Sequence, residues 1–224
     1  DDMLLISNSR TKAQGMLDST FAHSLINRYK VHPTKTTVST ERTPTTADHT
    51  VLLGEDPLKV TKEYTHLGIS RSKNMATLME ERADTGRRTV YSLMPAGLHG
   101  KNGLSPATAR KLIIAYVVPR ILHGLEALVI TPTHMKTLEH HYRALLRDLQ
   151  ALRDRTANEA IYLLFGLLPI EAELHLRILS LFGAITRLED SSTIKVLTRR
   201  QLYVKSDNSK SWFIYGSRVR DRII

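Results

Sequence analysis

Two adjacent carboxylates, Asp1 and Asp2, are the residues of this sequence best suited to chemistry, and an apolar run, Met3–Ser7, follows them directly. Acids in a tight turn before a strand can direct their oxygens into one cleft. Carboxylates there can hold Mg²⁺ while substrate phosphates complete the coordination shell. Alone the pair is a weak signal, because adjacent acids are common in solvated stretches. With the apolar run, it predicts a strand at Met3–Ser7 preceded by a magnesium-binding turn.

The charge balance of the chain points to a polyanionic partner. The 224 residues include 32 Lys and Arg against 22 Asp and Glu, a formal charge of +10. A positive field of this size favours nucleic acid, although a merely soluble basic protein is the alternative. The absence of cysteine excludes disulfides and thiolate zinc sites. A zinc site is also disfavoured at His134, His140 and His141, because they form no pair four residues apart and no acid is placed to join them.

Residues 1–70 combine one helix with several short strands. Apolar residues between Lys12 and Leu25 recur at helical spacing, and Ser7–Ser9 offers caps in front of them. The sequence Gly54–Pro57 is typical of the turn of a hairpin. We predict short antiparallel strands, at Thr36–Thr40, Val51–Leu53, Leu58–Val60 and Tyr64–Ile69.

Beyond residue 70 the pattern is that of long packed helices. Ser105–Pro106 and Thr131–Pro132 each place a capping side chain before a proline at the first helical position. Thr156–Glu159 has the spacing of a capping box. Leucine-rich stripes predict contacts between helices, and we interpret Trp212 as a core anchor rather than a platform for base stacking. The change of composition falls near Ser70–Asn74.

The most apolar stretch, Leu112–Ile130, predicts a buried helix rather than a membrane span. Pro119, Arg120, His123 and Glu126 interrupt it, which a bilayer would not tolerate easily. The acidic start of the chain lacks the basic region of a signal peptide. We therefore expect an intracellular protein, nuclear or cytoplasmic, with no membrane partner.

Several segments, in order, resemble the reverse transcriptases of non-LTR retrotransposons. Asp1–Ser7 resembles the end of the signature Tyr/Phe-Ala-Asp-Asp, with its first two residues missing. Pro33–Thr36 resembles the lysine-bearing palm segment that follows it, and Tyr64–Ile69 the primer grip. Arg87–Leu128 resembles the thumb, and Arg155–Leu181 the helical region after it.

This resemblance implies an α+β fold with a small antiparallel remnant of the palm sheet, followed by a mostly helical thumb and a helical C-terminal region. The implied divisions are residues 1–70 for the palm with primer grip, 71–155 for the thumb and 156–224 for the C-terminal extension. The implied activity is RNA-directed DNA polymerisation by two-metal nucleotidyl transfer. The implied partners are an RNA template, a DNA primer and deoxynucleoside triphosphates.

The resemblance also implies roles for individual residues. Asp1 and Asp2 would bind two Mg²⁺ ions together with a third acid. Lys35 would lie near the incoming triphosphate, although a surface lysine beside a strand is an equally good interpretation. Leu67 and Gly68 would place backbone amides against the primer end, because glycine permits close approach; a plain bend in a strand is the alternative.

Basic residues on the expected helices are candidates for contacts with the phosphates of the template–primer duplex. Such contacts provide affinity without reading sequence, and a solvated charged face is the alternative for each residue. The candidates are Arg82, Arg87, Arg88, Lys136, Arg143 and Arg147, with His140 on the same helical stripe as the last three.

The family's first catalytic aspartate and its nucleotide-binding fingers would lie upstream of residue 1. We therefore expect a fragment of a polymerase that is inactive alone. Two other classes of function stay open: a non-catalytic basic helical module that binds nucleic acid as a relic of a mobile element, and a helical scaffold that binds protein partners. The oligomeric state is not predicted.

Overall fold

The computed structural model describes residues 3–40, 51–71, 74–100 and 102–223. Helices make up 61% of the chain and the strands are few and short, which confirms the coarse α+β class. The chain divides into two compact units, residues 1–73 and residues 74–224, and each encloses its own buried apolar cluster. No helix in the described ranges is long and apolar enough to cross a membrane.

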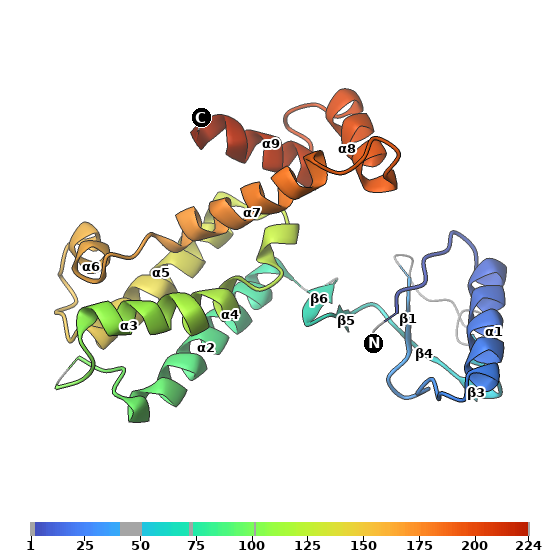
Figure 1. Cartoon of the computed structure of the whole chain (residues 1–224), viewed down its shortest axis with the longest axis horizontal. Helices are drawn as coiled ribbons and strands as arrows, with labels where there is room; N and C mark the ends of the chain where they lie inside the picture. Colours follow the sequence, from blue (N-terminus) through green and yellow to red (C-terminus); the bar gives the residue numbers. More distant parts are fainter. Residues whose placement is uncertain (1–2, 41–50, 72–73, 101, 224) are drawn as a thin grey trace. The chain divides into compact units, whose positions relative to one another are not determined.

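The first unit is built around one helix, α1 (Arg10–Ile26), which Ser9 caps by accepting a hydrogen bond from the amide of Lys12. This confirms the predicted helix, and Figure 1 shows it in blue. The unit also contains six short strands in its described residues: β1 (Thr37–Ser39), β2 (Leu52–Leu53), β3 (Asp56–Pro57), β4 (Lys59–Thr61), β5 (Tyr64–His66) and β6 (Ile69–Arg71).

The predicted hairpin is present, but its register differs from the expectation. β2 pairs antiparallel with β3, so Gly54 and Glu55 alone form the turn. The next strand, β4, pairs parallel with β1 instead of returning to β2, and the expectation of purely antiparallel strands was wrong. The long connection between β1 and β4 permits a parallel pairing, which needs a crossover. A Cβ at Gly54 would lie 2.7 Å from the ring of Phe21, so this turn requires glycine to pack on α1.

The predicted strand at Met3–Ser7 is absent: these residues form no strand. Met3, Leu4 and Ile6 are exposed, and only Leu5 packs against the apolar cluster of Leu17, Val51, Leu53 and Leu58. A strand needs a partner for its backbone groups, and no described segment pairs with this run.

The second unit is helical. Its long helices are α2 (Met75–Leu93), α5 (Pro132–Leu149) and α7 (Ile170–Thr186). Shorter elements connect and cover them: η2 (Met94–Ala96), α3 (Pro106–Leu112), η3 (Ile113–Val117), α4 (Val118–Leu122), η4 (Leu125–Ala127), α6 (Asn158–Phe165), α8 (Thr193–Val204) and α9 (Trp212–Ile223). α2 packs against α4 and α5, α7 packs against α5 and α9, and α8 packs against α9.

Local signals fixed several ends of these helices. Ser105 caps α3 and Thr131 caps α5, each with proline at the first helical position, as predicted. The capping box at Thr156–Glu159 was a wrong prediction, because Ala157 occupies the cap position of α6 and makes no side-chain cap bond. The expected helix over Leu112–Ile130 stops at Leu122, since Gly124 adopts a left-handed conformation with a φ of 79°.

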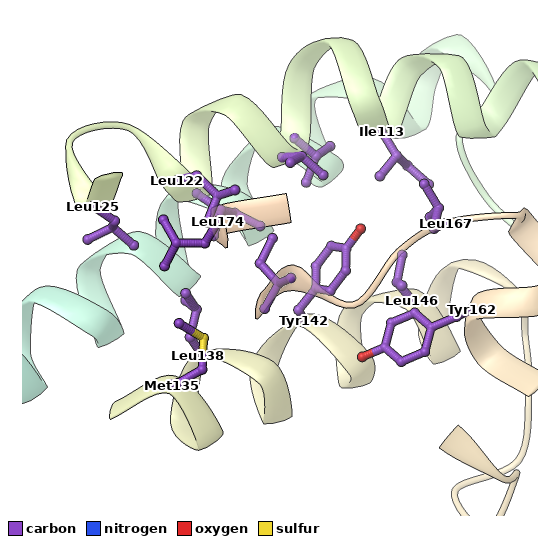
Figure 2. Packing of buried hydrophobic residues seen from close by; sticks show 14 of the residues in the cluster. Ile113, Leu122, Leu125, Met135, Leu138, Tyr142, Leu146, Tyr162, Leu167 and Leu174 are labelled. Atoms are coloured by element: carbon purple, nitrogen blue, oxygen red, sulfur yellow. The ribbon is translucent and has the colours of Figure 1, made fainter. Parts of the chain in front are cut away.

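One apolar core runs through most of the second unit, from Leu78 to Val219. Figure 2 shows residues of this core from several helices filling the space between α5 and the α3–α4 segment. Trp212 packs against the same core, which confirms its interpretation as an anchor. The same core includes residues on both sides of residue 155. The division into a thumb (71–155) and a C-terminal extension (156–224) therefore stays a prediction from the family resemblance.

The hydroxyl of Tyr142 is a weak point of this core. Tyr142 is 2% exposed, and its Oη has no hydrogen-bond partner among the described residues. Burial, followed by the charges of Glu173 and Glu139, raises the pKa of this phenol, so it stays neutral. The neighbouring Tyr162 stacks beside it with a ring distance of 6.4 Å and donates its own hydroxyl to Glu139.

We therefore expect Tyr142→Phe to raise the free energy of unfolding by about 1 kcal/mol. A buried hydroxyl without a partner loses its hydrogen bonds to water on folding and gains none in exchange. Tyr162→Phe removes the same atom but breaks a hydrogen bond, and we expect it to lower stability by about 1 kcal/mol. Urea denaturation followed by circular dichroism measures both. Destabilisation by Tyr142→Phe would show that its hydroxyl has a partner in solution.

Candidate nucleic-acid interface

Of the residues predicted to perform catalysis, Lys35 lies within the described part of the chain. Asp1 and Asp2 lie outside the described residues. Lys35 is exposed in the turn before β1, where its backbone amide donates to the carbonyl oxygen of His32 at 3.1 Å. Among the described residues, no group of three or more His, Asp or Glu side chains could hold a metal ion.

Leu67 and Gly68 form the turn of a second hairpin rather than the middle of a strand. β5 and β6 pair antiparallel, with His66 opposite Ile69, so the predicted single strand Tyr64–Ile69 was wrong. Both turn residues have positive φ, 51° at Leu67 and 73° at Gly68, as in a type I′ turn. Glycine adopts this conformation readily, whereas leucine does so at a cost. The 60% exposed side chain of Leu67 therefore stands at the tip of a hairpin.

The three arginines of α2 point in different directions, because successive residues of an α-helix are rotated by about 100°. Arg82 faces the protein: burial lowers its pKa, opposed by the charges of Glu81 and Glu126. Arg87 is exposed but pairs with Asp84 at 2.7 Å. Arg88 is exposed as well. Arg82 is therefore committed to contacts within the fold, which leaves Arg88 as the candidate of α2 best placed to meet a ligand.

The basic stripe of α5 is also only partly available. Lys136 is exposed, whereas Arg143 and Arg147 are half-buried. Arg147 donates from Nη2 to Oδ1 of Asn158 at 3.0 Å, and so it holds the connection between α5 and α6. Burial and Glu139 raise the pKa of Tyr162, and the charge of Arg143 opposes them, which places Arg143 near this tyrosine.

The three histidines near the start of α5 do not converge. Nδ1 of His134 lies 2.9 Å from the hydroxyl oxygen of Thr131, at the helix cap. The rings of His140 and His141 meet edge to face, with their centres 5.8 Å apart. His134 is therefore part of the helix cap. His140 is exposed and lies on the basic stripe.

A groove between α2 and α5 brings Arg87 and His141 together with Tyr91 and Asp148, which the sequence patterns did not single out. Its volume is about 240 Å³, and Ile121 and Tyr142 form part of its floor. Arg87 and the 56% exposed Tyr91 line one wall, and His141 and Asp148 line the other. Arg87 and Tyr91 are four residues apart, a spacing that predicts one helical face.

A second cavity lies among α5, α7 and α9. Its volume is about 310 Å³, and its polar lining includes Glu171, His175, Tyr215, Arg218 and Arg222. The spacing of Arg218 and Arg222 again predicts one face of a helix, but no sequence pattern pairs that face with α7. Two arginines therefore line the same cavity here, whereas among the described residues the basic ones predicted on α2 and α5 do not share a cavity of this kind.

The positive charge of the chain is concentrated in the second unit. Residues 74–224 contain 22 of the 32 Lys and Arg but 14 of the 22 Asp and Glu, which leaves a formal charge of +8. Part of this charge is offset locally, as where the single carboxylate of Asp190 pairs with both Lys195 at 2.9 Å and Arg199 at 2.8 Å. The excess of cations nevertheless gives this helical unit a positive field.

The sequence matches no protein-family model, and neither a curated protein nor a solved structure is significantly similar to it.

Proposed function

We propose that this chain is the C-terminal part of an RNA-directed DNA polymerase of the non-LTR retrotransposon type, and that its helical unit binds the backbone of the template–primer duplex. The formal charge of +8 on residues 74–224 carries the binding part of this proposal. Cations such as Arg88 and Lys136 stand exposed on that unit, where phosphates can reach them.

The catalytic part of the proposal depends on residue chemistry and on the family resemblance of the sequence. Two adjacent carboxylates, Asp1 and Asp2, are donors that suit Mg²⁺, and bound Mg²⁺ would supply charge stabilisation for phosphoryl transfer. Lys35 is exposed and so is free to approach a triphosphate. The hairpin tip at Leu67 and Gly68 is the proposed contact with the primer end.

Binding is tested first, with a labelled RNA–DNA primer–template titrated at several salt concentrations. We expect the logarithm of the association constant to fall linearly with the logarithm of salt concentration, with a slope of about −0.7 to −0.9 per phosphate neutralised. Replacing Arg88 and Lys136 together with glutamine should reduce the magnitude of that slope by about 1 to 2.

A matched control removes the same charge at a place where a neighbouring carboxylate already offsets half of it. Arg199 and Lys195 share Asp190, so replacing both with glutamine lowers the net charge by as much as replacing Arg88 and Lys136 does. It should nevertheless reduce the magnitude of the salt slope by less. Negligible affinity for the duplex at low salt, without salt dependence, would reject nucleic-acid binding and favour a scaffold for protein partners.

Catalysis is tested by Mg²⁺-dependent primer extension. We expect none from residues 1–224 alone, and extension by the chain joined to the sequence preceding it in its gene, lost in the variant Asp1→Asn. Duplex binding without extension by the longer chain would favour a non-catalytic module. That second candidate has one structural observation in its favour: residues 74–224 enclose a continuous core of their own.

A further inference from the structure

The cavity among α5, α7 and α9 differs from the rest of the basic surface because two arginines line one recess, Arg218 half-buried and Arg222 exposed. Arg218 and Arg222 are four residues apart on α9, about one helical turn, and both line the cavity together with His175 of α7. Most of the other lining is apolar and includes Met135 and Val219. A charged group bound here would therefore be partly removed from water, where each charged hydrogen bond is stronger than at the surface.

Neither arginine is neutralised by a carboxylate within the described part of the chain. The carboxylate nearest in sequence, Asp221, pairs instead with Arg220 at 2.7 Å. Glu171, the one acid that lines the cavity, lies 3.9 Å from Nε2 of His175. Nε of Arg218 is buried and has no hydrogen-bond partner among the described residues. A buried donor of this kind is costly unless a ligand or solvent accepts from it.

The polar groups of this cavity interact electrostatically. Burial raises the pKa of Tyr215, helped by Glu171 and opposed by Arg222 and Arg218. Burial lowers the pKa of His175, opposed by Glu171 and helped by Arg222. His175 is thus predominantly neutral at pH 7, and an anion bound beside it would favour its protonated, donating form. The positive end of the α5 dipole, at Thr131 and Pro132, lines the cavity too.

We propose that this cavity binds a phosphate group of the nucleic-acid backbone, with Arg218 and Arg222 as the principal donors and Tyr215 and His175 as auxiliary donors. Guanidinium groups suit phosphate oxygens because their planar donors can bind two oxygens at once. The inference deepens the proposed binding of nucleic acid by the helical unit and depends on it.

The same donors would bind a free phosphate ion, but a polynucleotide also meets the other cations of the helical unit, whose formal charge is +8. Arg218 and Arg222 outnumber Glu171 in the cavity, so either anion is attracted there, and the surrounding cations add affinity for a polyanion alone. The site therefore favours a backbone phosphate.

Nuclear magnetic resonance of the full chain with ¹⁵N-labelled arginine tests the assignment. The Nε–H signal of Arg218 reports on the cavity directly. We expect a short single-stranded oligonucleotide at low salt to shift this signal in a saturable manner, and inorganic phosphate to shift it only at much higher concentration. The variant Arg222→Gln should weaken the apparent affinity for the oligonucleotide by about tenfold or more. Arg222→Lys should weaken it by less, because lysine keeps the charge but cannot bind two phosphate oxygens with one planar group.

Arg220→Gln is the matched control, since it removes the same charge from the same helix at an exposed residue paired with Asp221 and outside the cavity. We expect it to leave the Arg218 response nearly unchanged.

Equal weakening of the oligonucleotide response by Arg220→Gln and Arg222→Gln would overturn the proposed site and indicate that general surface charge binds the oligonucleotide. Oligonucleotide binding detected by fluorescence anisotropy without a shift of Arg218 would overturn this inference alone and leave the proposed function standing. A response to inorganic phosphate with none to oligonucleotide would overturn the backbone assignment, and with it the support for nucleic-acid binding.

Discussion

Replacing Gly86 with valine is expected to lower the free energy of unfolding of the helical unit by about 3 kcal/mol, because the new side chain must enter a closed contact between α2 and α4. A Cβ at Gly86 would lie 2.6 Å from Cγ1 and 2.7 Å from Cδ1 of Ile121. Ile121 is 2% exposed and cannot move aside without disturbing the core. Alanine brings only the Cβ, and its better helix propensity, worth up to about 1 kcal/mol, offsets part of the strain. Gly86→Ala should therefore cost less than valine.

Gly15 of α1 provides the control for these substitutions. A Cβ at Gly15 would meet nothing within 4 Å, so Gly15→Ala should stabilise its helix by about 0.5–1 kcal/mol. Urea denaturation, followed by hydrogen exchange to assign the change to a unit, measures each variant. Ile121→Val combined with Gly86→Ala should recover part of the loss. Stabilisation by Gly86→Ala to the same degree as Gly15→Ala would show that α2 and α4 do not approach so closely.

The features that the sequence predicted well depend on neighbours along the chain. Ser9 caps α1, and Thr131 with Pro132 starts α5, because a cap and a proline act within one helical turn. Features that need a distant partner were predicted poorly. The run Met3–Ser7 has the composition of a strand but no described segment to pair with, and β4 pairs with β1 across the intervening hairpin. No local pattern contains that information.

The candidate site shows the same distinction. Composition correctly indicated an excess of positive charge, but it could not tell which cations the fold would use for itself. Arg147 looked like a phosphate contact on the basic stripe, yet it holds Asn158 at 3.0 Å. Conversely, Arg218 and Arg222 became a candidate site only when α9 was found beside α7 and the start of α5.

The position of α9 in turn depends on Trp212, and Trp212→Ala should lower the free energy of unfolding of the helical unit by about 3 kcal/mol. The indole Nε1 donates to the carbonyl oxygen of Glu126 at 2.7 Å, across 86 residues of sequence, and the ring packs against Phe182 with centres 6.3 Å apart. Loss of a large aromatic from a core typically costs about 3–5 kcal/mol, and the partial exposure of Trp212 places it at the lower end. Trp212→Phe keeps much of the apolar contact but leaves the carbonyl unpaired, for a loss of about 1–2 kcal/mol.

Tyr203→Ala is the control for Trp212, because this aromatic residue of α8 is 92% exposed and its removal should change stability by less than about 0.5 kcal/mol. Hydrogen exchange at the amides of α9 gives a second readout, since loosening of the anchor should raise exchange there before it does so in α5. Because α9 supplies both arginines of the cavity, the Arg218 signal should lose its sensitivity to oligonucleotide in Trp212→Ala even where the rest of the helical unit stays folded. Equal stability of Trp212→Ala and Tyr203→Ala would mean that other contacts hold α9 in place, and that the cavity persists without its anchor.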